Sequence, residues 1–199
     1  MLILSALPGY LIGSLSLSII ISQSFFGKDI RLSGSGNAGA TNVARVYGWG
    51  AGLATLGGDF AKGLLAMWMG ELLAGSPGMA ISGIACLLGH CFPLYYRFKG
   101  GKAVSVGLAV TLSAVSWQLF LLALIVFALI AFTTRWVSLA SVSAAASVGI
   151  ATFFLHPGFW PLILTEFTVA LLIFMHRSNL RRLVRGEEPK FTPGNSKNP

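Results

Sequence analysis

The sequence predicts an all-α membrane protein with seven transmembrane helices, an extracytoplasmic N-terminus and a cytoplasmic C-terminus. Hydrophobic residues make up 55% of the 199 residues and charged residues only 10%, and the mean hydropathy is +0.77. The apolar residues form runs long enough to cross a bilayer. The basic residues collect in alternate connections between these runs, which indicates how many of the runs cross.

The apolar runs place the expected spans at 2–24, 48–74, 79–96, 103–115, 117–133, 138–155 and 160–176. The first run lacks the basic start of a signal peptide, so it is interpreted as a span. As one helix, 103–133 would rise about 45 Å, well beyond the roughly 30 Å hydrocarbon core. As two spans it gives short helices that turn near Ser113 to Trp117.

Charge placement decides between six and seven spans. Within the first, third and fifth connections and the tail lie 13 of the 14 basic residues: Lys28, Arg31, Arg45, Arg97, Lys99, Lys102, Arg135, Arg177, Arg181, Arg182, Arg185, Lys190 and Lys197. The second, fourth and sixth connections hold none. Seven spans put all 13 on the cytoplasmic side, as the positive-inside rule requires. Six spans would put the tail opposite Arg45 and Lys102.

The length leaves room for one membrane domain, expected over 1–186, followed by a polar and mobile tail over 187–199. The net charge of +8 comes from short connections and the tail. Anionic lipids and phosphorylated substrates are therefore the expected partners, and nucleic acid is not.

The segment Gly34 to Arg45 is a glycine-rich loop between two apolar runs. Glycines let a backbone approach an anion closely, and Arg45 adds a bidentate donor. The loop contains G-x-G-x-x-G, but no strand precedes it, so a dinucleotide fold is rejected. Taken alone, it could equally be a flexible turn.

Two further clusters are expected on the same side. The first is Lys99-Gly100-Gly101-Lys102, where glycines at a helix N-terminus would free backbone donors for an anion; the alternative is a tight basic turn. The second runs from His176 to Glu188 at the exit of the last span. In a helix, His176, Asn179 and Leu183 would share a face, while the arginines could simply be a basic end that faces lipid phosphates.

Several catalytic arrangements are absent from the sequence. No Ser–His–Asp triad is evident, and none of the three histidines is followed five residues later by Asp, the pattern of thioester-dependent acyltransferases. Clustered intramembrane aspartates are missing too, so no metal site is expected. No cofactor is expected either. Asp59 and Lys62 are expected to form an ion pair inside the bundle, and Cys86 and Cys91 to be buried packing residues.

The three clusters together resemble the bacterial acyl-phosphate:glycerol-3-phosphate acyltransferase family, PlsY. The matching segments are G-S-G-N-A-G-A-T-N-V-A-R at 34–45, K-G-G-K at 99–102 and H-R-S-N-L-R-R-L-V-R-G-E-E at 176–188. Asp59-Phe60-Ala61-Lys62-Gly63, Leu88-Gly89-His90 and Val137-Ser138-Leu139-Ala140-Ser141 also match, in order along almost the whole chain.

The resemblance implies acyl transfer from a fatty acyl phosphate to the 1-hydroxyl of glycerol 3-phosphate, giving lysophosphatidate and phosphate in the bacterial inner membrane. It implies the catalytic residues Ser35, Arg45, Lys102, His176 and Asn179. The implied substrate-binding residues are Gly34, Gly36, Asn37, Gly39, Thr41, Asn42, Gly100, Gly101, Ser141 and Glu188, the last of which would brace the site. His176 is either a general base or a phosphate ligand, and the resemblance favours the ligand role.

Ala103 and Val106 stand where the family usually has glycine and threonine, which implies an effect on glycerol 3-phosphate affinity. Membrane lipids and the enzyme that supplies acyl phosphate are further partners to consider. The rival functions are a transporter of phosphate esters, which should show an internal repeat and midplane polar residues, and a non-catalytic scaffold.

Overall fold

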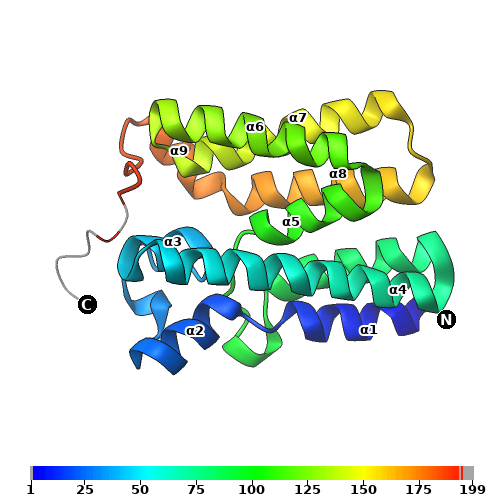
Figure 1. Cartoon of the computed structure of the whole chain (residues 1–199), viewed down its shortest axis with the longest axis horizontal. Coiled ribbons are helices and arrows are strands. Elements are labelled where there is room, and N and C mark those ends of the chain that lie inside the picture. The colour runs from blue at the N-terminus through cyan, green and yellow to red at the C-terminus, as the bar shows by residue number, and fades with distance from the viewer. Residues whose placement is uncertain (1, 193, 195–199) are drawn as a thin grey trace.

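The computed structural model describes residues 2–192 and 194, and within them every regular element is a helix (Figure 1). The α-helices are α1 (Leu2–Gly13), α2 (Leu17–Phe26), α3 (Ala40–Tyr47), α4 (Trp49–Cys91), α5 (Val104–Val110), α6 (Trp117–Thr134), α7 (Val137–Leu155), α8 (Phe159–Met175) and α9 (Arg177–Val184). Four apolar stretches are long enough to cross a membrane, or five if the bent pair α8 and α9 is one span. The predicted all-helical membrane protein is confirmed.

The first predicted span is broken, because α1 ends at Gly13 and α2 begins at Leu17. Residues from other elements form hydrogen bonds to this broken segment. The Lys62 ammonium donates to the Leu15 carbonyl at 2.6 Å, and the Ser14 hydroxyl accepts from the Leu94 amide at 3.2 Å. A continuous helix over 2–24 would leave Lys62 without this partner.

Helix α4 is a hairpin of two arms. A straight helix of 43 residues would be about 65 Å long, twice the thickness of the hydrocarbon core. Ala74 and Gly75 have non-helical backbone angles, and the carbonyl of Gly78 lies where a side chain on Gly70 would be, so the arms pack closely. The second arm ends at Cys91, earlier than predicted, because Pro93 disfavours helical geometry at Phe92.

The stretch 103–133 is not one long helix, because the chain turns at Ser116. Helix α5 continues into a π-helical turn, Thr111–Val115. The helix then ends at Ser116, whose backbone angles are extended. The Ser116 hydroxyl accepts from the Leu119 amide at 3.3 Å and so caps α6.

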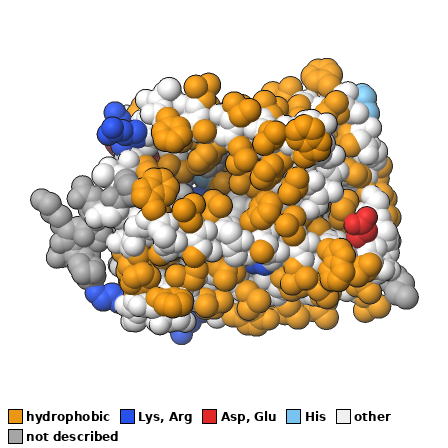
Figure 2. Space-filling model, viewed as in Figure 1, with side chains coloured by type: hydrophobic (Ala, Val, Ile, Leu, Met, Phe, Trp, Pro, Cys, Tyr) orange, Lys and Arg blue, Asp and Glu red, His pale blue; other side chains and the backbone are white. Residues whose placement is uncertain are grey.

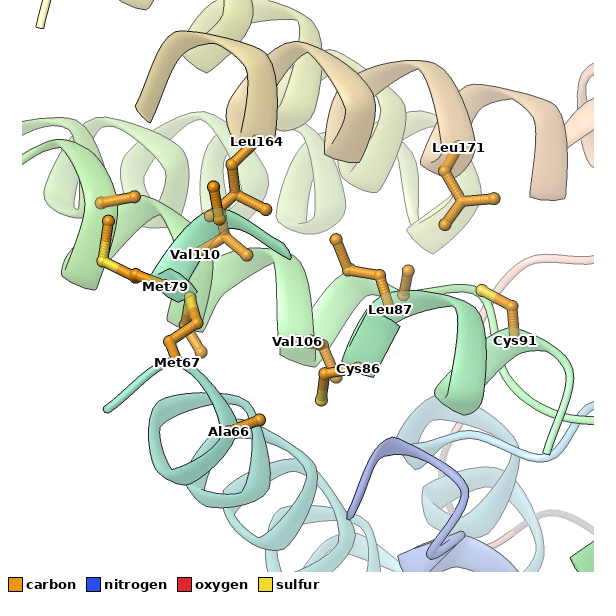
Figure 3. Close-up of a cluster of buried hydrophobic side chains, with 14 residues drawn as sticks. Ala66, Met67, Met79, Cys86, Leu87, Cys91, Val106, Val110, Leu164 and Leu171 are labelled. Carbon is orange, nitrogen blue, oxygen red and sulfur yellow. The ribbon is translucent and has the colours of Figure 1, made fainter. Parts of the chain in front are cut away.

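The helices lie in two layers, with α1 and α4 in one and α6, α7 and α8 in the other, and α5 between them (Figure 1). Buried side chains from α4, α5 and α8 fill the space between the layers, among them Met67, Cys86, Leu87, Val106 and Leu164 (Figure 3). Cys86 and Cys91 are buried free thiols, as predicted. Helices α2, α3 and α9 lie at the end of the bundle opposite the start of α1 (Figure 1).

Apolar side chains cover the visible long face of the molecule, whereas most of the visible Lys and Arg side chains gather at the end where α3 and α9 lie (Figure 2). This is the distribution expected of a protein whose long faces contact lipid.

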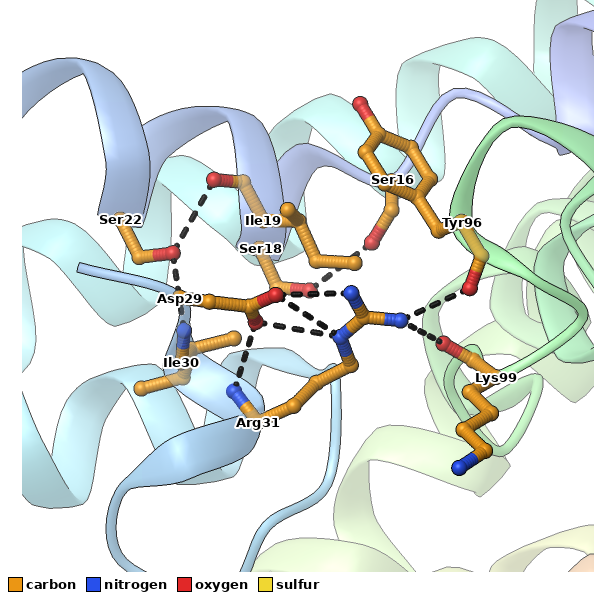
Figure 4. A network of polar contacts seen from close by, with 9 residues as sticks. All are labelled: Ser16, Ser18, Ile19, Ser22, Asp29, Ile30, Arg31, Tyr96 and Lys99. Atoms are coloured by element: carbon orange, nitrogen blue, oxygen red, sulfur yellow. Dashed lines mark hydrogen bonds and ion pairs between the residues drawn. The ribbon is translucent and has the colours of Figure 1, made fainter.

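At this end, Arg31 connects two loops (Figure 4). Its guanidinium pairs with Asp29 at 2.7 Å and donates to the carbonyls of Tyr96 at 2.8 Å and Lys99 at 3.3 Å. The hydrogen bond from Arg31 lowers the pKa of Asp29, so the pair stays charged at neutral pH. The segment before the first glycine-rich loop is thereby fixed to the segment that carries the second.

Candidate active site

The three sequence clusters meet around one cavity of about 320 Å³ at the basic end of the molecule. Most of the residues predicted from the sequence line it: Ser35, Gly36, Asn37, Gly39, Thr41, Asn42, Arg45, Lys102, Ser141, His176, Asn179 and Glu188. Gly34, Gly100 and Gly101 do not line the cavity. They belong to the two loops that carry lining residues.

Asn42, at the start of α3, organises the first loop. Its amide donates to the carbonyls of Ile30, Ser33 and Asn37 and accepts from the Ser35 amide at 2.8 Å. Every polar atom of the buried Asn42 side chain therefore has a backbone partner. The loop bends back over this amide at Gly34 (φ 59°), where a side chain would collide with Asn42 Oδ1. Asn42 lines the cavity, and its substrate-binding role stays a prediction. What its hydrogen bonds show is that it shapes the loop that carries Ser35.

The second loop also differs from the sequence-based expectation. The Gly100 amide donates to the Cys91 carbonyl at 3.1 Å, and the Gly101 amide donates to the His90 carbonyl at 3.0 Å. These donors are therefore not free for an anion. The two glycines instead let the loop lie directly on the end of α4, which brings Lys102 to the cavity.

Lys102 connects the second cluster to the third, because its ammonium donates to Asn179 Oδ1 at 2.6 Å. Partial burial lowers the pKa of Lys102, with further lowering from Arg182 and Arg45 that Glu188 opposes. The cavity thus carries a partly desolvated ammonium whose charge an anionic ligand would stabilise.

His176 lies where the chain bends by 54° between α8 and α9, and its ring is buried. Its Nδ1 lies 2.9 Å from the Leu172 carbonyl. Because a carbonyl oxygen only accepts, Nδ1 must carry a proton, and Nε2 is the nitrogen left for the cavity. A neutral ring would offer Nε2 as an acceptor or base, and a charged ring would offer a second N–H donor.

Arg45 reaches the cavity from α3 and is half-buried, which lowers the pKa of its guanidinium, an effect that Glu188 opposes. The centre of its guanidinium lies 5.9 Å from the Phe191 ring. On α7, the hydroxyl of Ser141 donates to the Val137 carbonyl at 2.9 Å, so its oxygen can still accept.

Glu188 holds the third cluster together. Its carboxylate accepts from Ser138 at 2.7 Å, from Asn179 at 2.6 Å and from Arg182 at 2.8 Å. Burial acts to raise the pKa of Glu188, but these hydrogen bonds outweigh it and hold the pKa below its usual value. The carboxylate therefore fixes the amide whose oxygen accepts from Lys102.

We expect Glu188→Gln to lower the free energy of unfolding by about 1–3 kcal/mol. The NH2 group of the glutamine would replace a carboxylate oxygen that accepts hydrogen bonds and would face donors instead. Since the folded-state pKa of Glu188 is depressed, its contribution is present above the unfolded-state value of about 4.3 and is lost as pH falls through the lower folded value. Thermal unfolding of both proteins across pH checks this. An equal difference between them at all pH values would contradict it.

Among the cavity residues that sequence reasoning did not assign to the site are two titratable ones on α4, Asp59 and His90. The predicted ion pair between Asp59 and Lys62 is confirmed at 2.8 Å. It was treated as internal bracing, and nothing local in the sequence showed that the Asp59 side chain also borders the site. The signal available was that both residues belong to the segments that match the acyltransferase family.

A second, apolar cavity of about 140 Å³ adjoins the first, since Leu56, Val104, Phe127 and Ser141 line both. Its other walls come from α5, α6, α7 and α8. At its edge Leu124 is 37% exposed on the outer surface of the bundle. A polar, basic cavity therefore adjoins an apolar one, and one side chain that lines the apolar cavity is also exposed at the surface of the bundle.

Ala103 occupies a left-handed conformation (φ 65°, ψ 10°) and is fully buried. An L-residue pays a steric cost there that glycine does not. We expect Ala103→Gly to raise the unfolding free energy by about 1 kcal/mol. A rise in melting temperature in detergent would show this. A fall would mean that packing of the Ala103 methyl group outweighs the backbone strain.

Comparison with known proteins identifies the family of the chain. A family model described as glycerol-3-phosphate acyltransferase matches residues 3–186. The glycerol-3-phosphate acyltransferase of Finegoldia magna is 40% identical over 191 residues and covers 96% of each chain. That of Methylobacillus flagellatus is 42% identical over 186 residues, 93% of this chain and 94% of the other.

Two solved structures share the fold. The crystal structure of PlsY (YgiH), an integral membrane glycerol 3-phosphate acyltransferase, in its glycerol 3-phosphate form superposes with a TM-score of 0.88 at 34% identity, covering 96% of this chain and 95% of the other. Its lysophosphatidic acid form gives a TM-score of 0.86 at 33% identity, with the same coverage. The chain therefore belongs to the glycerol-3-phosphate acyltransferase family and is an integral membrane acyltransferase.

Proposed function

We propose that the protein transfers a fatty acyl group from acyl phosphate to the 1-hydroxyl of glycerol 3-phosphate and releases lysophosphatidate and inorganic phosphate. The observation that carries this proposal is a cavity lined by Arg45, Lys102 and several neutral donors, which adjoins an apolar cavity. Such a space suits two phosphate-bearing substrates, one of which has a long hydrocarbon chain.

An acyl phosphate is already an activated donor, so the site needs to position the reactants and stabilise charge. In this proposal Ser35 and the loop over 34–39 hold the acyl-phosphate group. Glycerol 3-phosphate binds at the side chains that converge from the other clusters, namely Arg45, Lys102, Ser141, His176 and Asn179, with Glu188 behind them. The attacking hydroxyl loses its proton either to Nε2 of a neutral His176 or to a substrate phosphate oxygen.

The apolar cavity is proposed to take the part of the acyl chain next to the carbonyl. Leu56 and Phe127 line both cavities and would guide the chain from the phosphate site into the space between the helices. The remainder would leave past Leu124 into lipid, whose hydrocarbon offers it an equally apolar environment.

We further propose seven spans in the bacterial inner membrane, with the N-terminus outside and the site on the cytoplasmic face. The hairpin in α4 and the break at Ser116 support seven passes. The start of α1 and helix α9 lie at opposite ends of the bundle, which supports placing the N-terminus and the site on opposite sides of the membrane (Figure 1). Residues 1–186 would form one domain, followed by a tail over 187–199. Glu188 in this tail lines the site. Residues 1, 193 and 195–199 lie outside the described residues.

The test is donor comparison with purified protein and glycerol 3-phosphate. Palmitoyl phosphate, palmitoyl-CoA and palmitoylated carrier protein are supplied in parallel, and lysophosphatidate is measured. We expect product from the acyl phosphate alone. Turnover only with a thioester would overturn the donor assignment. The rival functions, a transporter of phosphate esters and a scaffold, find no support in the family to which the chain belongs. Contact with the enzyme that supplies acyl phosphate remains a proposal.

A further inference from the structure

Three buried side chains under the cavity have no role in the mechanism above. Asp59 and Lys62 lie on the first arm of α4, and His90 lies at the end of the second. Lys62 Nζ is 2.8 Å from Asp59 Oδ1 and 3.1 Å from His90 Nδ1. All three side chains are nearly inaccessible to solvent, yet Asp59 and His90 border the cavity.

The hydrogen bonds determine which nitrogen of His90 carries the proton. Lys62 also donates to the Leu15 carbonyl at 2.6 Å and pairs with Asp59, so it is a charged donor. An ammonium can only donate, so Nδ1 of His90 must accept from it. Asp59 Oδ1, at 3.6 Å from Nδ1, is too far to take a proton from that nitrogen. His90 is therefore neutral, with its proton on Nε2.

The Nε2–H group lies where the two glycine-containing loops meet. A side chain on Gly101 would collide with Nε2 and would lie 2.8 Å from the carbonyl oxygen of Ala38, which belongs to the first loop. Within the described part of the chain, Nε2 has no hydrogen-bond partner. Because His90 borders the cavity, this N–H group is placed to donate to a ligand that occupies it.

We propose that His90 is a further substrate-binding residue, whose Nε2–H donates to a phosphate oxygen of a substrate held between the 34–39 and 99–102 loops. This inference rests on the proposed function. Asp59 and Lys62 are positioning residues, because they fix the tautomer and hold the ring with Nε2 toward the cavity. The phosphate belongs either to glycerol 3-phosphate or to the acyl phosphate, and varying each substrate separately distinguishes the two.

A pair of amide variants separates this role from a structural one. The amide nitrogen of glutamine reaches the place of Nε2, whereas in asparagine the amide oxygen can take the place of the acceptor Nδ1 and no donor reaches the place of Nε2. His90→Gln therefore keeps the donor to the substrate, and His90→Asn keeps the group beside Lys62. We expect His90→Asn to raise the KM of one substrate roughly 10- to 100-fold, as loss of a hydrogen bond to a charged group does, and His90→Gln to stay within a few-fold of wild type.

The opposite ranking, with asparagine active and glutamine impaired, would show that His90 serves only as a partner of Lys62 and would overturn the proposal. Equal activity of both variants with wild type would overturn it as well. If wild type makes no product from acyl phosphate, the proposed function fails, and the binding role of His90 is then decided without turnover.

That decision comes from the full-length wild-type protein labelled with nitrogen-15 in histidine. The proposal predicts that the His90 signals show a protonated Nε2 and an unprotonated Nδ1, and that they shift on titration with glycerol 3-phosphate or inorganic phosphate. A protonated Nδ1, or signals that neither ligand moves, would contradict the proposal even if both variants failed to fold.

Discussion

Replacing Lys102 by methionine is expected to lower kcat/KM for glycerol 3-phosphate by roughly 100- to 1000-fold, the usual effect of removing one preorganised charge-stabilising donor. Methionine keeps much of the side-chain volume but removes the cation, and it leaves Asn179 Oδ1 without its 2.6 Å donor. Steady-state kinetics with each substrate varied in turn measure the loss. Activity within tenfold of wild type would remove Lys102 from the site.

Lys99→Met is the matched control, because Lys99 is exposed, lies outside the cavity lining and contributes only its carbonyl to Arg31. The pKa of Lys102 also predicts a pH dependence. Burial lowers this pKa, so the ammonium loses its proton at a lower pH than an ordinary lysine. The KM for glycerol 3-phosphate in the wild type should therefore begin to rise at a lower pH than an ordinary lysine, with its pKa of about 10.4, would produce. A rise only at the pH expected of an ordinary lysine would argue against a buried ammonium.

Gly101→Ala is expected to raise the KM for glycerol 3-phosphate by at least tenfold, although Gly101 does not line the cavity. The new methyl group would meet the His90 ring on one side and the Ala38 carbonyl on the other, so the loop must move. Lys102 moves with it, and displacement of a binding group by about 1 Å can cost 100-fold in rate.

Gly57→Ala serves as the control for this substitution. Gly57 lies on the exposed face of α4, no atom lies within 4 Å of the added methyl group, and alanine favours a helix. Kinetics and thermal unfolding of both variants should show a kinetic defect for Gly101→Ala only. Unchanged kinetics in Gly101→Ala would mean that the loop yields at no cost to the site.

The helices were largely predictable from the sequence because hydropathy and charge act locally. Ser116 caps the start of α6 with its own hydroxyl, and Pro93 disfavours helical geometry at the residue before it, so both boundaries follow from a single local residue. The break near Ser14 was not predictable, since it depends on Lys62 from another helix taking the Leu15 carbonyl. A helix break whose freed carbonyl accepts a hydrogen bond from a residue distant in sequence gives no recognisable pattern in the sequence around it.

The members of the site were predictable as three clusters, but the division of labour within them was not. Asn42 carries an amide of the kind that often binds anions. In the structure, however, this amide forms hydrogen bonds to four backbone groups near its own loop. Gly100 and Gly101 were expected to offer donors and instead permit close packing on His90. Both outcomes depend on contacts between residues distant in sequence.

Product formation from palmitoyl phosphate and glycerol 3-phosphate tests the central claim most directly, with wild type, Ser35→Ala and Lys102→Met compared at matched purity. Ser35 and Lys102 lie in different loops around the same cavity. We expect equal amounts of lysophosphatidate and phosphate from wild type and almost none from either variant. Wild-type rates in both variants would contradict it, because the reaction would then take place outside this cavity.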